Sequence, residues 1–224
     1  MFPSGQLRWQ LVETARQMSE LGLTPGTSGN VSCRVSGGFL ITPSGLDYRT
    51  MRSQDIVEMF PDGRVHGRHE PSTEWRMHAA LYAHRSDVHA VVHTHSMFAT
   101  TLACAAKEIP AYHYMVAVGG GDNIRCAAYE TFGTQALADK ALTALESRKA
   151  CLLANHGLLA LGRDLQDALN VAKQVEVLAE QYWRVLQIGE PVVLGGGAME
   201  QVMERFSTYG SAGREQTKRT GRAR

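Results

Sequence analysis

The stretch HAVVHTHS, residues 89–96, guides the interpretation of the rest of the sequence. Its apolar, mostly β-branched residues predict a buried strand that ends in a His-Thr-His triplet. Alternate side chains of a strand point to the same face, so His93 and His95 are expected to project together from one side. Two imidazoles held in this way form half of a metal site. Two unrelated histidines would give the same pattern, so the prediction depends on further ligands elsewhere in the chain.

Two further residues complete a candidate metal site. His156 lies between an apolar run, residues 151–154, and a glycine, which places it at the edge of a strand and not inside a core helix. Three neutral imidazoles with one open position are typical of catalytic zinc. Glu74 is then the fourth ligand or the base beside the metal. The other histidines are interpreted as surface, helix-face or hydrogen-bonded core residues: His66, His69, His78, His84, His89 and His113.

Three polar loops, each beside a strand end or a helix start, predict an anion site. They are residues 27–30 (TSGN), 44–45 (SG) and 72–73 (ST). Backbone N–H groups and hydroxyls hold a phosphate without a large basic patch, and the helix after the third loop adds a favourable dipole. One such loop alone would be an ordinary turn or helix cap. None has the spacing of a dinucleotide-binding or P-loop motif, so no nucleotide is implied.

The composition limits the class of protein. A chain of 224 residues with 44% hydrophobic residues can bury a core without disulfides. A net charge of +1 gives no general attraction to nucleic acid or to a membrane surface. The four cysteines form no CxxC pair, which favours a reduced, cytoplasmic protein. The first residues lack the pattern of a signal peptide, and no apolar run approaches the ~20 residues of a membrane span.

The pattern of strands and helices predicts one α/β domain over residues 1–210. Short turns join the early strands, so the central sheet is expected to be mixed and largely antiparallel, with helices on both faces in three α/β/α layers. A strict βαβ alternation is missing, which argues against a doubly wound nucleotide-binding fold. The expected helices are residues 5–21, a helix that begins at 71–72, and residues 96–106, 133–145 and 165–186. The expected strands are residues 31–35, 39–42, 56–60, 64–67, 89–95 and 151–161, the last interrupted at 155–157, and residues 109–115 are expected to be extended.

The last residues, 211–224, are expected to form a separate tail. They have little apolar content and several arginines and lysines, which is typical of a flexible, solvated C-terminus. The alternative is an arm that closes over an anionic ligand.

Seven motifs, in order along the chain, resemble the class II aldolase/adducin family. The resemblance extends from about residue 7 to Gly210, and the set is far more specific than one pair of histidines. It implies the three-layer fold of that family. The motifs are GLTPGTSGNVS (22–32), LITPSGLDY (40–48), PSTEWRMH (71–78), VVHTHS (91–96), IPAYHYM (109–115), YETFGT (129–134) and NHGLLA (155–160).

The resemblance implies a role for each candidate residue. Zinc would be held by His93, His95 and His156, and Glu74 would be both a metal ligand and the acid/base. The phosphate of the substrate would be held by residues of the three polar loops, where Ser44 and Thr73 differ from the commoner residues but keep a hydroxyl. These phosphate-binding residues are Gly29, Asn30, Ser44, Gly45, Ser72 and Thr73.

The resemblance also implies an assembly. Tyr114 stands at the position of a catalytic tyrosine that reaches into the site of a neighbouring subunit. Phe132 and Tyr209 match aromatic residues of the substrate pocket. The family forms fourfold-symmetric homotetramers with sites between subunits, so the same assembly is expected here.

The function implied by the resemblance is that of a zinc-dependent aldolase. Such an enzyme reversibly cleaves a ketose 1-phosphate into dihydroxyacetone phosphate and an aldehyde, with the metal stabilising the enediolate. Mn²⁺ or Co²⁺ could replace Zn²⁺. The candidate substrates are L-fuculose 1-phosphate and related 5-deoxypentulose or 5-methylthioribulose 1-phosphates, and the motifs do not choose between their aldehydes. No lysine lies in the motifs at a position that a Schiff base would need.

Several alternatives remain open. A methylthioribulose 1-phosphate dehydratase would use the same zinc and carboxylate for β-elimination. A pentulose-phosphate 4-epimerase usually carries aspartate where Glu74 stands. An adducin-like interaction module loses metal histidines that this chain keeps, and a metal-stabilised scaffold would not need the phosphate loops. The sequence around Tyr114 and Phe132 favours cleavage.

Overall fold

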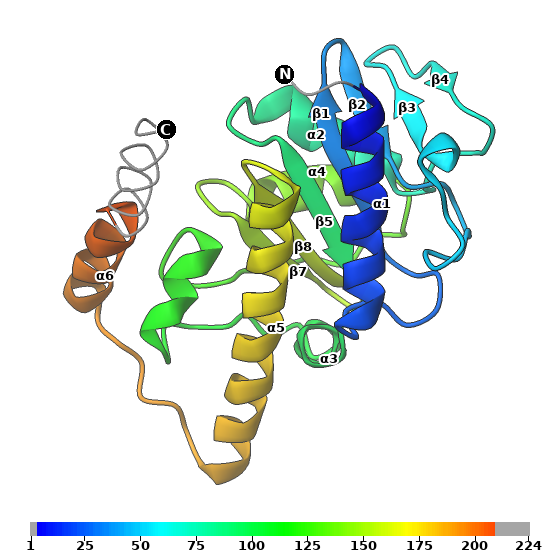
Figure 1. Cartoon of the computed structure of the whole chain (residues 1–224). Coiled ribbons are helices and arrows are strands. Elements are labelled where there is room, and N and C mark those ends of the chain that lie inside the picture. The colour runs from blue at the N-terminus through cyan, green and yellow to red at the C-terminus, as the bar shows by residue number, and fades with distance from the viewer. Residues whose placement is uncertain (1–3, 209–224) are drawn as a thin grey trace, which may run out of the picture.

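A computed structural model describes residues 4–208, which form one sheet covered by helices on both faces (Figure 1). The eight strands lie in the order β4-β3-β2-β1-β5-β8-β7-β6. Every neighbouring pair is antiparallel except β6 and β7. The predicted three-layer architecture with a mixed, largely antiparallel sheet is therefore confirmed. The strands are β1 Asn30–Val35, β2 Gly38–Ile41, β3 Val57–Met59, β4 Val65–His66, β5 Ala90–Thr94, β6 Cys126–Ala127, β7 Ala150–Leu153 and β8 Gly157–Gly162.

The helices divide between the two faces of the sheet. One buried cluster joins the sheet to α1, α3 and α5, and a second cluster joins its other face to α2 and α4. A smaller cluster packs α6 against the 3₁₀ helix η2. The helices are α1 Ser4–Glu20, η1 Ser53–Asp55, α2 Trp75–His84, α3 Met97–Cys104, η2 Tyr114–Gly119, α4 Gln135–Ala144, α5 Leu165–Ile188 and α6 Gly196–Thr208.

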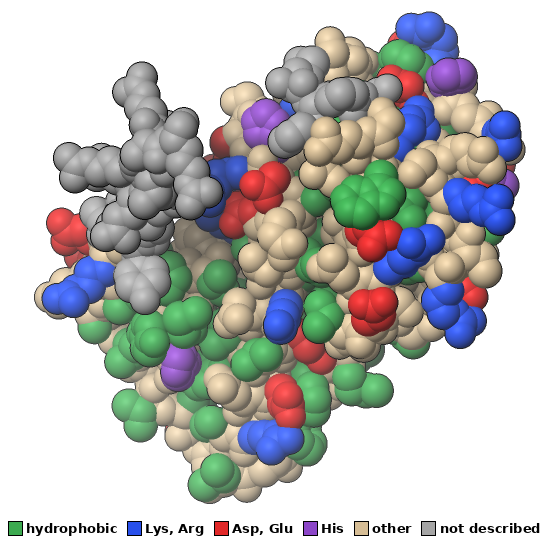
Figure 2. All heavy atoms as spheres, viewed as in Figure 1, with side chains coloured by type: hydrophobic (Ala, Val, Ile, Leu, Met, Phe, Trp, Pro, Cys, Tyr) green, Lys and Arg blue, Asp and Glu red, His purple; other side chains and the backbone are tan. Residues whose placement is uncertain are grey.

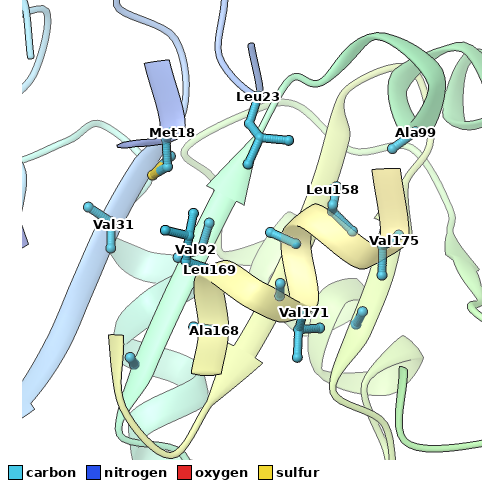
Figure 3. Close-up of a cluster of buried hydrophobic side chains, with 14 of the residues drawn as sticks. Met18, Leu23, Val31, Val92, Ala99, Leu158, Ala168, Leu169, Val171 and Val175 are labelled. Atoms are coloured by element: carbon cyan, nitrogen blue, oxygen red, sulfur yellow. The ribbon is translucent and has the colours of Figure 1, made fainter. Parts of the chain in front are cut away.

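The central strands alternate between the two clusters. Val92 and Leu158 pack against α5 and α1, and Figure 3 shows them with Val171 and Val175 of α5. Val91, on the same strand as Val92, faces the α2 and α4 layer instead. This alternation places the odd-numbered residues of β5, including His93, on the face that α2 covers.

The largest difference from the sequence prediction lies around His156. Residues 151–161 were expected to form one interrupted strand, but β7 and β8 are separate antiparallel strands of a hairpin. Asn155 has a φ of 54°, the left-handed conformation that a tight turn requires. His156 therefore lies in a turn and not at an interruption within one strand.

Four smaller differences concern two element boundaries and two elements that were not predicted. Helix α2 begins at Trp75 and not at residues 71–72, because Pro71 pairs with Pro43 in an isolated β-bridge. Residues 109–115 are not extended throughout, since η2 already begins at Tyr114. The sequence patterns also missed β6, which is only two residues long, and α6, which begins within a run of glycines.

Two predictions fall outside the described residues. These are the pocket role of Tyr209 and the basic tail at 211–224. Among the helices of residues 4–208, none combines the length and apolar content that a membrane span requires.

Candidate active site

Four side chains from distant parts of the chain converge at one point. His93 and His95 come from the end of β5, His156 from the β7–β8 turn and Glu74 from the residue that caps α2. One ligand atom of each lies within 4.8 Å of the others. The Nε2 atoms of His93 and His95 are 3.0 Å apart, and Oε1 of Glu74 lies 3.1 Å from Nε2 of His156. The four residues predicted as metal ligands therefore form one cluster.

A glycine explains how the turn reaches the end of β5. A Cβ atom at Gly157 would lie 2.3 Å from the backbone oxygen of Thr94 and 3.0 Å from Cδ2 of His95. Only glycine permits this approach without displacing the backbone. The close contact between the hairpin and β5 sets the ring of His156 beside those of His93 and His95, with centroids 4.8 and 5.0 Å away.

The donor set fits a metal cation. Nδ1 of the buried His93 lies 2.9 Å from the carbonyl of Leu158, so a neutral His93 directs the lone pair of Nε2 into the cluster. That Nε2 atom is 3.0 Å from Oε2 of Glu74. Oε1 of Glu74 is buried and has no hydrogen bond within residues 4–208. Lone pairs of nitrogen and oxygen that face one another repel unless positive charge lies between them, and three imidazoles with a carboxylate are ligands that zinc prefers.

The pKa values of Glu74, His93 and His95 reflect burial and the charges of the neighbouring groups. Burial alone would raise the pKa of Glu74, but the nearby imidazoles of His93 and His156 outweigh burial and hold the pKa well below its usual range. Burial, together with His93 and His156, lowers the pKa of His95 to about 4. Burial also opposes charge on His93, yet Glu74 raises its pKa overall. The cluster thus combines an ionised carboxylate with an imidazole that is neutral at pH 7, the form that binds a metal.

A cavity of about 380 Å³ opens from this cluster. Its wall carries Glu74, His95 and His156 together with the three polar loops. All six residues predicted to hold phosphate line it, as does Phe132. These six are Gly29, Asn30, Ser44, Gly45, Ser72 and Thr73.

Gly29 and Asn30 of the first loop each make a contact that explains the type of residue at that position. Gly29 has a φ of 76°, and a Cβ atom there would lie 2.6 Å from the backbone oxygen of His93. The first loop therefore packs directly against β5. Asn30 is buried, and its side-chain amide donates to Oε2 of Glu74 at 2.9 Å. The Asn30 amide therefore serves Glu74, whereas the sequence had suggested only a phosphate contact.

Of the two remaining predicted residues, Tyr114 and Tyr209, the structure describes only Tyr114. Tyr114 lies on η2 with half of its surface exposed, away from the cavity that residues 4–208 of its own chain form. Tyr209 lies outside the described residues. Conversely, sequence reasoning missed Tyr129, Glu130 and Asn155, which line the cavity. Each is close to a recognised motif residue, Phe132 or His156, and that proximity was the available signal.

Comparisons with known proteins agree with this geometry. The family model for the class II aldolase and adducin N-terminal domain matches residues 9–183. The chain therefore belongs to the class II aldolase and adducin family, which confirms the resemblance seen in the motifs.

Three individual aldolases show how similar this chain is to characterised members of the family. The chain is 54% identical over 204 residues to the 5-methylthioribulose-1-phosphate/5-deoxyribulose-1-phosphate aldolase of Rhodospirillum rubrum, covering 91% of this chain and 92% of that one. It is 46% identical over 210 residues to the L-fuculose phosphate aldolase of Escherichia coli K12, covering 92% and 96%. A solved structure of an L-fuculose 1-phosphate aldolase superposes with a TM-score of 0.87 at 41% identity, covering 90% of this chain and 96% of that one.

Proposed function

We propose that this class II aldolase reversibly cleaves a ketose 1-phosphate into dihydroxyacetone phosphate and an aldehyde. The observation that carries the proposal is the cavity itself, which has a metal-ligand cluster at its inner end and three hydroxyl- and glycine-rich loops on its wall. A substrate with a phosphate at one end and a carbonyl beside it matches both features at once. Relatives named as aldolases of phosphorylated sugars support this substrate class.

The metal is proposed to be Zn²⁺, with Mn²⁺ or Co²⁺ as replacements. His93, His95 and His156 would hold it with Glu74, because three imidazoles and a carboxylate suit zinc better than they suit a hard cation such as Mg²⁺. When bound, the metal supplies Lewis-acid chemistry that withdraws electron density from the substrate carbonyl.

The phosphate is proposed to bind to the loops. Ser44, Ser72 and Thr73 offer hydroxyl groups, and Gly29 and Gly45 allow backbone N–H groups to approach the anion. The third loop leads directly into α2, whose N-terminus favours negative charge. The side-chain amide of Asn30 donates one N–H to Glu74, which leaves its second N–H for the anion.

Two residues are proposed to move protons. Glu74, which is ionised and lies at the inner end of the cavity, would return a proton to C3 after the C3–C4 bond breaks, and would remove it in the synthetic direction. Tyr114 would exchange the proton of the C4 oxygen. Since Tyr114 lies away from the cavity of its own chain, it would serve the site of a neighbouring subunit.

A homotetramer is proposed on the same grounds. Figure 2 shows hydrophobic side chains gathered on the surface over η2 and the lower part of α5, and Tyr114, Trp183 and Ile188 are exposed there. A surface rich in exposed apolar side chains is typical of an interface between subunits. We also propose a cytoplasmic location, which the four free cysteines support.

A coupled assay for dihydroxyacetone phosphate tests the function. We expect its release from 5-deoxyribulose 1-phosphate, 5-methylthioribulose 1-phosphate and L-fuculose 1-phosphate, with higher kcat/KM for the first two because the relative with 54% identity is named for them. Borohydride added with substrate should leave the activity intact, since no Schiff base forms. Consumption of 5-methylthioribulose 1-phosphate without dihydroxyacetone phosphate would instead indicate the dehydratase.

A further inference from the structure

A continuous chain of buried hydrogen bonds runs behind Glu74, between β1 and α2. Nδ2 of Asn30 lies 2.9 Å from Oε2 of Glu74, and Oδ1 of Asn30 lies 2.5 Å from Nε2 of His78. Nδ1 of His78 lies 2.6 Å from Oγ of Ser32, which lies 2.7 Å from the hydroxyl of Tyr82. All five residues are buried, and His78 and Ser32 have no exposed surface.

The spacing of these residues explains why the chain is continuous. Glu74, His78 and Tyr82 follow one another at intervals of four along α2, and Asn30 and Ser32 at an interval of two along β1. Four residues of a helix advance about 6 Å and two residues of a strand about 6.6 Å, so the two rows stay in step. The side chains alternate between helix and strand from Tyr82 to Glu74. This pairing gives each of the five buried residues at least one hydrogen-bond partner.

The direction of every bond follows from the orientation of Asn30, whose Nδ2 lies against Glu74 and whose Oδ1 lies against His78. A carboxylate only accepts, so Asn30 donates through Nδ2 and presents its carbonyl oxygen to His78. Nε2 of His78 must therefore carry a proton. Burial lowers the pKa of His78 to about 3, so the ring is neutral and Nδ1 accepts from Ser32. Ser32 in turn accepts from Tyr82, whose pKa burial raises well above its usual value.

We propose that Ser32, His78 and Tyr82 are positioning residues that act through Asn30 on Glu74. Their hydrogen bonds all point toward the carboxylate, and the protonated Nε2 of His78 prevents the Asn30 amide from turning its oxygen toward Glu74. Oε2 of Glu74 is thereby anchored, while Oε1 has no hydrogen bond within the described chain and faces His156. The inference rests on the proposed acid/base role of Glu74.

The test isolates the proton transfer of Glu74 from cleavage. In D₂O, the zinc-loaded enzyme with dihydroxyacetone phosphate alone should exchange one proton of the hydroxymethyl carbon for deuterium, a step that needs Glu74 but no aldehyde. The substitution His78→Phe keeps a ring and removes both nitrogens. We expect the exchange rate and kcat to fall by about ten- to a hundredfold, because Asn30 then loses the bond that orients its own hydrogen bond to the charged Glu74. KM and the zinc content should stay unchanged, because the phosphate loops and the three metal histidines are untouched.

A rescue variant and a control separate positioning from stability. His78→Gln retains an N–H donor near the position of Nε2, and we expect it to restore most of the exchange rate that His78→Phe loses. Cys33→Ala removes a buried side chain from β1 on the opposite face of the sheet, where it contacts the other core cluster. It should lower the melting temperature without changing the exchange rate.

The tautomer of His78 tests the direction of the chain in the wild-type protein, whatever the variants do. ¹⁵N spectra of the histidine-labelled protein, with the His78 signals assigned by their loss in His78→Gln, should show a neutral ring protonated at Nε2. Protonation at Nδ1 would reverse the chain and overturn the proposal. Equal exchange rates in the wild type and in His78→Phe, or an equal loss in His78→Phe and His78→Gln, would also overturn it. A wild type that exchanges no deuterium would count against the proposed function, which the tautomer does not test.

Discussion

The inner end of the cavity and its outer rim differ sharply in burial. His93 has no exposed surface and Glu74 only 7%, whereas Tyr129 and Phe132 are 59% and 63% exposed. The inner groups are held by hydrogen bonds from β8 and β1, and the described residues place nothing comparable over the rim. The contrast suggests that one chain fixes the metal-ligand cluster with Glu74, while the outer part of the cavity depends on what covers it. Changes at the inner end should therefore remove catalysis, and changes at the rim should alter substrate choice.

Removal of the metal should have the largest effect at the inner end. Dialysis against EDTA should reduce cleavage of a ketose 1-phosphate to background, because the three imidazoles and Glu74 supply no Lewis acid by themselves. The melting temperature should also fall, since a ligand that binds only the folded state stabilises it. Added Zn²⁺ should restore both. Full activity in protein shown by elemental analysis to be metal-free would contradict the proposed chemistry.

The next largest effects should come from the two residues proposed to transfer protons, Glu74 and Tyr114. Glu74→Gln keeps the size of the side chain but cannot accept a proton, and we expect kcat to fall by about 10²–10⁴-fold. Tyr114→Phe should lower cleavage by about 10²-fold and leave deuterium exchange of dihydroxyacetone phosphate unchanged. The matched control is Glu180→Gln on the exposed surface of α5, where only the ion pair with Arg184 is lost.

A mixture of these two variants tests whether Tyr114 acts in the site of a neighbouring subunit. If Tyr114 serves a neighbouring site, refolded mixtures of Glu74→Gln and Tyr114→Phe contain sites with both wild-type residues, and activity should return. Mixtures as inactive as the separate variants would show that Tyr114 does not act between subunits.

A smaller effect is expected from Gly157→Ala. The added Cβ would contact the backbone oxygen of Thr94 and push the turn that carries His156 away from β5. We expect zinc affinity, measured by chelator competition, to fall by about ten- to a hundredfold, as when the support of a metal ligand is lost. Gly189→Ala, which meets open space, is the control and should leave affinity unchanged.

The smallest effect should come from the rim. Phe132→Leu keeps an apolar side chain of different shape beside the cavity, so the ratio of kcat/KM between 5-methylthioribulose and L-fuculose 1-phosphates should change by less than about tenfold. Deuterium exchange of dihydroxyacetone phosphate should not change. A large loss of exchange would mean that the rim also supports the chemistry.

The sequence predicted features that depend on neighbouring residues better than features that depend on contacts between distant parts of the chain. The pairing of His93 with His95 required only the two-residue period of a strand, and the loops at residues 27–30, 44–45 and 72–73 were visible from composition. The hairpin at Asn155 was missed because an apolar run gives no sign of whether it continues or folds back. Strand β6 has two residues, too few for any periodic pattern.

The buried chain of hydrogen bonds behind Glu74 also depends on contacts between distant residues, which the sequence pattern does not reveal. His78 was interpreted as a helix-face or hydrogen-bonded core histidine, which describes its burial but not its partners. The spacing of Glu74, His78 and Tyr82 was present in the sequence. That they meet Asn30 and Ser32 depends on β1 lying under α2, a contact between residues more than 40 positions apart.

The sequence by itself thus determined the types of ligand, the strand that orients two of them and the family. Only the tertiary structure decided that His156 lies in a turn beside His95 and that the Asn30 amide bonds to Glu74. The physical reason is that side-chain period and loop composition are local properties of the backbone. The packing of a helix on a strand, by contrast, is set by burial summed over the whole chain.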